Sequence, residues 1–132
     1  MIFKTEGFVH TDRREDFYRE IFFDLESDAE ILRFEFFSAG KEIFFHVEDP
    51  SGILRVQHQS KSEPSSVVLH SQDEKSGAGT FPGKILKGRW NISVFTYAPR
   101  FNRMWGRIPF EVKVYGPDEI TCPGPVKKNE VK

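Results

Sequence analysis

One short segment of the sequence carries residue types that proteins use to bind sugars. Residues 100–107, RFNRMWGR, place an indole ring among three arginines and an asparagine. Aromatic rings stack on the apolar C–H faces of sugars, and arginine and asparagine side chains hydrogen-bond hydroxyl groups. The segment is therefore a candidate glycan-binding loop, with the candidate residues Tyr97, Asn102, Arg103, Trp105 and Arg107. In the second interpretation, which we favour, Trp105 covers an open end of the hydrophobic core and the arginines are solvated.

Residue types that could perform catalysis are not arranged for it in the sequence. The histidines, His10, His46, His58 and His70, form no HxH or HExxH motif and so have no local metal-ligand spacing. His46 and His58 flank a predicted turn and could approach each other, but no third ligand is evident. No serine stands in a GxSxG motif, and a single cysteine, Cys122, excludes an intramolecular disulfide. We therefore expect no enzyme activity and no cofactor.

An acidic segment offers a different kind of site. Asp24, Glu26 and Asp28 stand at alternate positions, as in some calcium-binding loops. The segment lacks the glycine turn and the closing glutamate of an EF-hand. Two interpretations stay open: a solvated strand end, or a calcium site at a corner of a β-sandwich.

The charge balance and hydropathy argue against two classes of partner. The chain has 19 basic and 20 acidic residues, for a net charge of −1. Nucleic acids and anionic membranes attract proteins with a positive excess. Residues 1–16 contain no apolar run long enough for a signal peptide, and no segment approaches the length of a membrane span. We expect a soluble, cytoplasmic protein that binds neither nucleic acid nor membrane.

Apolar and polar residues alternate along most of the chain, which is the pattern of half-buried β-strands. Fourteen phenylalanines strengthen the preference for strands. Residues 49–52, DPSG, predict a turn, and the polar residues 71–79 predict a loop. Short strands are expected at residues 2–9, 17–25, 30–37, 43–48, 53–59, 65–71, 88–95 and 108–115.

Short strands without a helical period predict an all-β fold. The expected architecture is an antiparallel β-sandwich, jelly-roll-like, with about seven to nine strands. Residues 1–118 would form this domain, and residues 119–132 a flexible tail or linker. Trp90 is expected in the core. Four phenylalanines are expected on the outer faces, where they favour a docking surface or a homodimer: Phe22, Phe37, Phe44 and Phe95.

Five segments occur in an order that resembles the β-sandwich domain found ahead of the catalytic domain in PHP-type metallophosphoesterases. They are FDLES, ILRFEFF, IFFHVEDPSG, KILKGRWNISVF and PFEVKVY, between about residues 17 and 115. The chain is also similar to bacterial pre-peptidase C-terminal domains. The resemblance rests on a strand followed by Asp-Pro-x-Gly and on a Gly-Arg-Trp that opens a strand.

The resemblance implies an accessory role. The metal ligands of these phosphoesterases lie in the catalytic domain, in a His-x-His motif that this sequence lacks. The resemblance therefore implies a non-catalytic domain that packs on or positions a metallophosphoesterase-like hydrolase domain or partner protein. The alternative function is a carbohydrate-binding module that uses the loop around Trp105.

Overall fold

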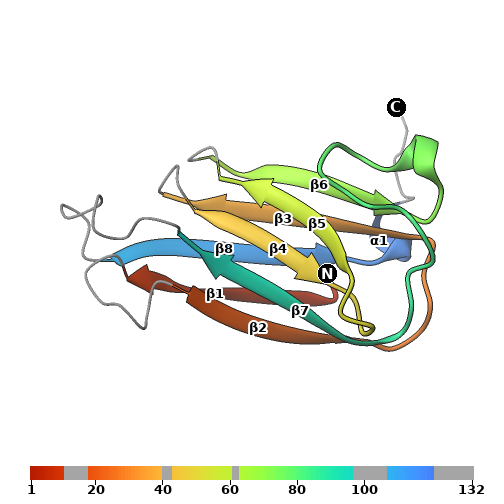
Figure 1. Ribbon diagram of the computed structural model, residues 1–132, viewed down its shortest axis with the longest axis horizontal. Coiled ribbons are helices and arrows are strands. Elements are labelled where there is room, and N and C mark those ends of the chain that lie inside the picture. Colours follow the sequence, from red (N-terminus) through yellow and green to blue (C-terminus); the bar gives the residue numbers. More distant parts are fainter. Residues whose placement is uncertain (11–17, 40–42, 61–62, 97–106, 121–132) are drawn as a thin grey trace.

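The computed structural model describes residues 1–10, 18–39, 43–60, 63–96 and 107–120. Within these ranges the chain forms eight β-strands and two short helices (Figure 1). Neither described helix is long or apolar enough to cross a membrane. The strands are β1 (Phe3–His10), β2 (Tyr18–Leu25), β3 (Ile31–Ser38), β4 (Phe44–Glu48), β5 (Leu54–Gln59), β6 (Ser65–His70), β7 (Gly88–Phe95) and β8 (Arg107–Tyr115). The helices are the 3-10 turn η1 (Asp73–Lys75) and α1 (Pro117–Ile120).

The strands form two antiparallel sheets of four strands each, packed face to face (Figure 1). One sheet has the order β1-β8-β3-β6 and the other β2-β7-β4-β5. The first strand thus pairs with the last, the second with the seventh, the third with the sixth and the fourth with the fifth. This nested pairing is the strand order of a jelly roll. The predicted antiparallel, jelly-roll-like β-sandwich is confirmed.

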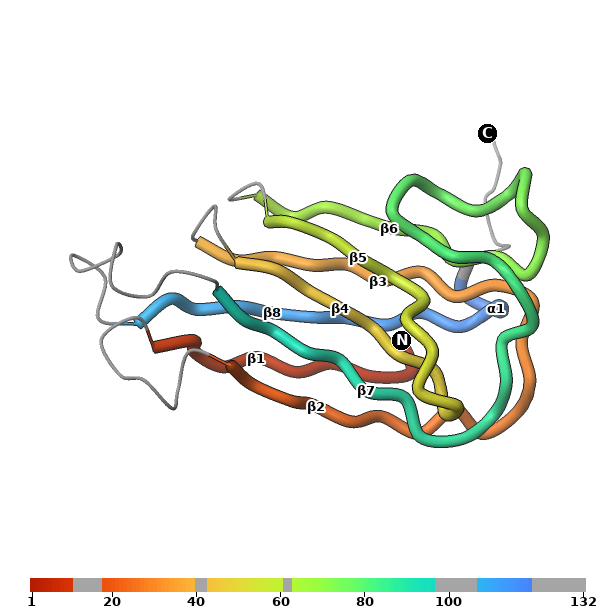
Figure 2. Tube along the Cα trace, in the orientation of Figure 1, coloured from red at the N-terminus to blue at the C-terminus, as the bar shows by residue number. Residues whose placement is uncertain are grey.

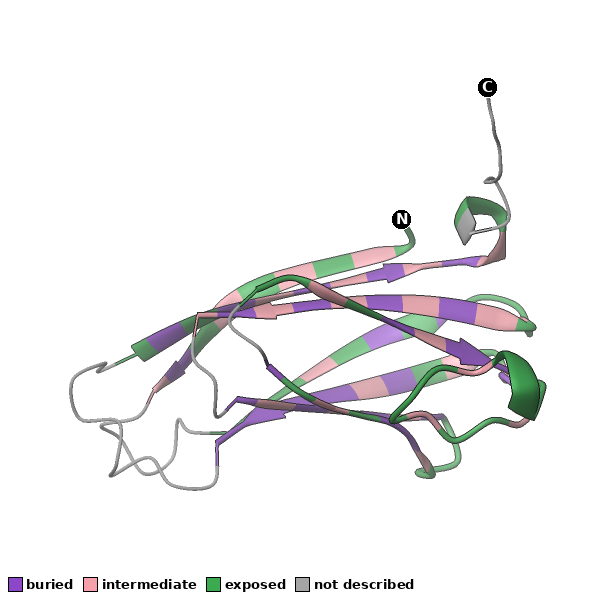
Figure 3. Ribbon diagram, turned by 90° about the horizontal axis from the view of Figure 1, so that it is seen from above, coloured by how far each residue is buried: buried purple, intermediate pink, exposed green. Residues whose placement is uncertain are grey.

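The core lies between the two sheets and is built from inward-facing side chains (Figure 3). Buried residues recur at every second position along β3, β4 and β8, as the alternation predicted. Trp90 on β7 is fully buried beside Ile92 and Val94. Its indole N–H donates to the backbone oxygen of Leu86 over 2.9 Å, so the polar atom of this buried ring is satisfied.

The edge strands β5 and β6 lie on the same side of the sandwich, where the chain following η1 connects them (Figure 2). The Gly77 N–H donates to the Val68 oxygen of β6, and the Gly79 oxygen accepts from the Gln57 N–H of β5, both over 2.8 Å. These bonds occupy backbone groups that an open sheet edge would leave unpaired. Gly79 has a φ of +78°, and a Cβ there would lie 2.5 Å from the Gln57 oxygen, so the approach requires glycine.

The predicted turn at residues 49–52 is confirmed. Gly52 has a φ of +82° and its N–H donates to the Asp49 oxygen over 2.9 Å. The Asp49 side chain also accepts hydrogen bonds from the backbone N–H groups of Ser51 and Ile53, at 2.9 and 3.1 Å. An aspartate therefore organises this turn through its own backbone and side chain.

Arg55 departs from the predicted strand pattern because its side chain is buried, with only 4 % exposed. It lies beside a register shift between β4 and β5. Its guanidinium group donates four hydrogen bonds of 2.7 to 3.2 Å, to the Asp49 carboxylate and to the backbone oxygens of Phe81, Gly83 and Lys84. This residue therefore fastens the connection between β6 and β7 to β5.

Candidate ligand-binding face

The loop predicted to bind glycans lies almost wholly outside the described residues. Arg107 is the one candidate that the structure describes: it opens β8 and is exposed. Its guanidinium carbon lies 4.5 Å from the ring centre of Phe8 on β1, a cation–π contact. The other candidates fall within residues 97–106 and stay predictions: Tyr97, Asn102, Arg103 and Trp105.

Where the chain leaves β7, three aromatic side chains cross the outer face of the β2-β7-β4-β5 sheet. Tyr18 on β2 pairs with Phe95 on β7, and Phe95 pairs with Phe44 on β4. The ring centres are 5.9 Å apart for Tyr18 and Phe95, and 5.7 Å apart for Phe95 and Phe44. Phe95 is 8 % exposed and Tyr18 is 45 % exposed. We call these three residues the aromatic row.

A second row of side chains, all polar, runs beside the aromatic row. Glu20, Ser93 and His46 are register partners on β2, β7 and β4. The Tyr18 hydroxyl lies 3.1 Å from Ser93 Oγ and 3.5 Å from Glu20 Oε2. Asn91 Nδ2 donates to the same Glu20 oxygen over 3.2 Å. We call Glu20, Ser93 and His46 the polar row; hydrogen bonds connect it to the aromatic row.

His46 belongs to the polar row and contacts the aromatic row edge-on. The ring centres of His46 and Phe95 are 4.9 Å apart and the ring planes are 87° apart. Burial lowers the pKa of His46, and the Glu48 carboxylate on the same strand offsets part of this effect. The neutral imidazole is therefore favoured at neutral pH, with one donor and one acceptor nitrogen.

Phe22 extends this face along β2. It stands four residues after Tyr18, so both side chains project from the same side of the sheet. Phe22 is 49 % exposed, and the guanidinium carbon of Arg89 lies 5.7 Å from its ring centre. Arg89 also forms an ion pair with Asp24 over 3.4 Å. The face thus presents two exposed rings with the Glu20 carboxylate between them.

The outer face of the β1-β8-β3-β6 sheet has a different character, because its charges are paired with one another. Lys4 lies 3.5 Å from Glu111, Lys113 lies 3.7 Å from Glu35, and Arg33 lies 3.3 Å from the same Glu35. Ion pairs with this degree of exposure contribute little to stability and are typical of a solvated surface. The two outer faces of the sandwich are therefore chemically distinct.

The polar row contains a carboxylate, a hydroxyl and an imidazole, but their order does not build a catalytic triad. Ser93 lies between Glu20 and His46 in the register of the sheet. In a triad, the imidazole lies between the carboxylate and the hydroxyl. Ser93 is also buried, with its hydroxyl against that of Tyr18. The arrangement suits hydrogen bonding to a ligand better than nucleophilic attack.

His46 and His58, which could have approached each other across the turn, do not do so. His58 pairs with the core residue Phe45, and its ring stacks on the inward-facing Phe36 with centres 5.2 Å apart. His46 projects from the opposite side of the sheet. In the described part of the chain, no three histidine, cysteine, aspartate or glutamate side chains form a group that could hold a metal ion.

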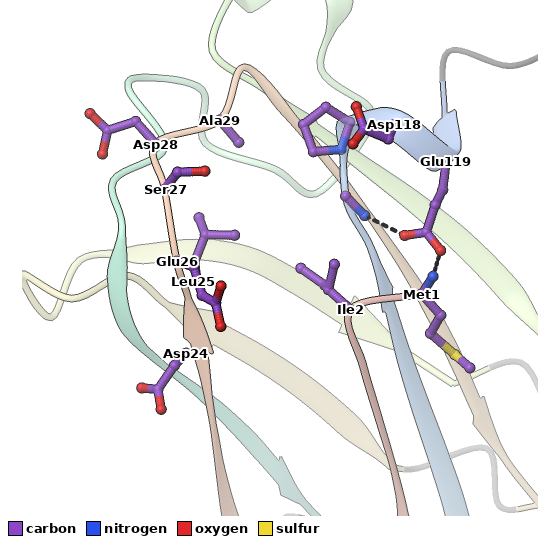
Figure 4. Close-up of a pocket in the computed structure, with 12 residues that line it drawn as sticks. Met1, Ile2, Asp24, Leu25, Glu26, Ser27, Asp28, Ala29, Asp118 and Glu119 are labelled. Atoms are coloured by element: carbon purple, nitrogen blue, oxygen red, sulfur yellow. Dashed lines mark hydrogen bonds and ion pairs between the residues drawn. The ribbon is translucent and has the colours of Figure 1, made fainter.

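An open cleft of about 510 Å³ at one end of the sandwich is lined by residues 24–29 together with both ends of the described chain. Glu119 accepts the Gly116 N–H over 3.1 Å and pairs with the amino group of Met1 (Figure 4). Asp24 and Asp28 point away from Glu119, and Asp28 accepts the N–H of Lys87 over 2.8 Å. These carboxylates do not converge, which favours the solvated strand end over the calcium site.

The aromatic row was only partly recognised in the sequence. Phe44 and Phe95 were expected to face outward, but the alternation could not align them with Tyr18 or bring the polar row together. The strands β2, β7 and β4 are distant in sequence, and only their pairing creates the site. The available signal was that each outward pattern combines an aromatic and a polar residue two positions apart: YxE at 18–20, FxH at 44–46 and SxF at 93–95.

Comparisons with known proteins bear on the fold. No family model matches the sequence, and neither does any curated protein. Among solved structures, the chain is similar to the pre-peptidase C-terminal domain of a collagenase from Bacillus anthracis, with a TM-score of 0.57 and 12 % sequence identity. The similarity covers 87 % of this chain and 90 % of that chain. It supports the predicted likeness to pre-peptidase C-terminal domains at the level of the β-sandwich fold, and the likeness to PHP-associated domains stays a prediction.

Proposed function

We propose that the chain is a non-catalytic accessory β-sandwich domain that packs on or positions a hydrolase. The observation that carries the proposal is the correspondence with a domain of a collagenase, which extends over 87 % of this chain and 90 % of that domain. A likeness of fold alone is an analogy, so function must be argued from a surface as well. The supporting surface is the outer face of the β2-β7-β4-β5 sheet, whose exposed Tyr18 and Phe22 are typical of a ligand-binding surface through which such a domain could position a hydrolase.

The class of hydrolase is a further part of the proposal. The resemblance of about residues 17 to 115 to the domain ahead of PHP-type catalytic domains favours a metallophosphoesterase-like partner. The structural likeness to a collagenase domain makes a peptidase the other candidate class for the partner hydrolase. We place the protein in the cytoplasm, with the hydrolase either on the same polypeptide or on a separate chain.

The test is to isolate the native protein with an antibody raised against residues 1–132. The preparation is assayed on phosphomonoester, phosphodiester and peptide substrates, and its polypeptides are identified by mass spectrometry. We expect hydrolysis of one substrate class by the native preparation, a catalytic domain joined to or copurifying with the chain, and no hydrolysis by recombinant residues 1–132. Hydrolysis by the recombinant chain itself, or a native preparation without a hydrolase, would refute the accessory role.

A second candidate function is the carbohydrate-binding module that uses the segment around Trp105. It is favoured by two described residues near the ends of residues 97–106: Phe95, two positions before them, belongs to the aromatic row, and Arg107, directly after them, is exposed at the start of β8. If this segment is the sugar-binding site, Trp105→Ala leaves the fold intact and abolishes sugar binding. Unchanged binding in this variant would exclude the segment as the site.

A further inference from the structure

We propose that the outer face of the β2-β7-β4-β5 sheet is itself a binding site for a neutral oligosaccharide. Tyr18 and Phe22 are the stacking platforms, and Glu20 accepts hydrogen bonds from sugar hydroxyls. This site consists of described residues and includes none of residues 97–106. It deepens the proposed accessory role, since a domain that binds a glycan keeps its hydrolase beside a polymer, but the binding can be measured on the chain alone.

Two rings on one strand supply the apolar part of the site. Tyr18 and Phe22 are among the most exposed aromatic side chains described, and four residues of strand separate them by about 13 Å. Tyr18 packs against Phe95, and its hydroxyl lies 3.1 Å from Ser93 Oγ on the adjacent strand. The ring is therefore oriented before any ligand arrives, which lowers the entropy lost on binding.

The carboxylate between the two rings supplies the polar part. Glu20 Oε2 accepts the Asn91 amide over 3.2 Å, and this bond orients the carboxylate. Among the residues that the structure describes, no cation forms an ion pair with Glu20. An ionised carboxylate has about four acceptor positions. Glu20 therefore has acceptor capacity left for ligand hydroxyl groups, and hydrogen bonds to a charged acceptor are stronger than those between neutral groups.

The charges of this face select among ligand classes. Glu20, Asp24 and Glu48 lie on it, and Arg89 is paired with Asp24. The carboxylates therefore outnumber this cation and repel phosphate or sulfate groups, which disfavours nucleic acids and acidic polysaccharides. A protein partner that dried this surface would bury the Glu20 carboxylate without a cation, which is unfavourable. A neutral glycan carries no anionic group for the carboxylates to repel. It also leaves Glu20 with partners, because its hydroxyls donate to the carboxylate while its C–H faces cover the rings.

The experiment is affinity electrophoresis of the full chain in native gels that contain one soluble polysaccharide each. The panel is hydroxyethylcellulose, xylan, galactomannan and laminarin, with heparin as the polyanion. The variants are Tyr18→Ala, Phe22→Ala and the near-isosteric Glu20→Gln, which tests the site even if an aromatic variant fails to fold. Phe81→Ala is the matched control because Phe81 is 46 % exposed but belongs to the connection between β6 and β7. Trp105→Ala separates this face from the predicted loop.

We expect at least one neutral polysaccharide to retard the chain. Glu20→Gln and each aromatic variant should weaken this affinity by about tenfold, while Phe81→Ala and Trp105→Ala leave it unchanged. The proposal is overturned if no neutral polysaccharide retards the chain, if heparin alone does so, or if only Trp105→Ala abolishes retardation. It is also overturned if Phe22→Ala dissociates a dimer without affecting retardation. A chain that binds no glycan but copurifies with a hydrolase would refute this site and leave the accessory role standing.

Discussion

Among single residues, Arg55 holds the connection between β6 and β7 against β5 through side-chain hydrogen bonds. Its buried guanidinium group bonds the Asp49 carboxylate, at 3.2 Å, and three backbone oxygens. Arg55→Met leaves Asp49 buried without its cation, so we expect the free energy of unfolding to fall by about 3–5 kcal/mol. Arg55→Lys keeps the charge but has a compact donor group in place of the planar fork, and should lose less. Urea denaturation measures both, and a loss below about 1 kcal/mol for Arg55→Met would contradict this role.

His46 gives the outer face a dependence on pH. Its pKa is lowered in the folded chain by burial, whereas in the unfolded chain it lies near the usual value of about 6.5. Between these two values the unfolded chain binds more protons, so stability falls as pH decreases through that window. The side chains opposite His46 on the adjacent strands, Ser93 and Gln57, are uncharged, and Glu48 is its charged neighbour on the same strand.

We expect His46→Gln to reduce the loss of stability between about pH 7.5 and pH 5, because the variant lacks this proton-linked group. Urea denaturation of both proteins across the range measures the difference. If the wild-type chain and the variant lose stability in parallel, the lowered pKa of His46 has no role in the linkage.

At the level of elements, the connection between β6 and β7 is sensitive to substitution at Gly79, where it approaches the edge strand β5. Gly79→Ala combines an unfavourable φ with a Cβ that would lie 2.5 Å from the Gln57 oxygen, so we expect a loss of about 2–4 kcal/mol. Gly52→Ala is the matched control: its φ is also positive, at +82°, but no atom lies within 4 Å of the added Cβ. It should cost about 1–2 kcal/mol.

Hydrogen exchange localises the effect of Gly79→Ala. The Gln57 N–H, which donates to the Gly79 oxygen over 2.8 Å, should exchange faster in Gly79→Ala and at the normal rate in Gly52→Ala. Equal losses of stability in the two variants would show that the connection does not need the close approach.

The strands themselves were predictable, and their irregularities were not. Strict alternation along β3 and β4 predicted which residues enter the core, because a strand with one buried face must repeat every second residue. The burial of Arg55 escaped prediction, since it depends on a register shift in β4–β5 pairing and on carbonyl groups of a distant connection. The spacing of residues along the sequence does not predict such contacts.

For the whole molecule, stability should depend on the core between the sheets and hardly on the outer rings. Phe36 is 1 % exposed and stacks on Phe34, Phe45 and His58, with ring centres 4.7 to 5.9 Å apart. We expect Phe36→Ala to cost about 3–5 kcal/mol. Phe22→Ala, at an exposed position, should cost less than about 1 kcal/mol. Thermal and urea unfolding test both, and a large loss in Phe22→Ala would mean that this ring serves the fold.

The fold class was predictable from the sequence, whereas the strand order and the site were not. Many short alternating strands with turns between them leave few architectures besides a sandwich. The nested pairing of β1 with β8 joins residues about a hundred positions apart, and local patterns do not encode partners at that distance. The residues that share the outer face could not be predicted for the same reason, because Glu20, Ser93 and His46 meet only through the pairing of β2, β7 and β4.

The claim that the outer face of the β2-β7-β4-β5 sheet binds a neutral oligosaccharide is tested most directly by nuclear magnetic resonance. The ¹⁵N-labelled chain is titrated with soluble hexasaccharides of the neutral polysaccharides, and shifts of backbone amides are mapped. We predict saturable shifts that cluster at residues 18–22, 44–46 and 91–95. Shifts confined to the opposite face, around Lys4, Glu35 and Lys113, or no shifts with any hexasaccharide, would contradict the account.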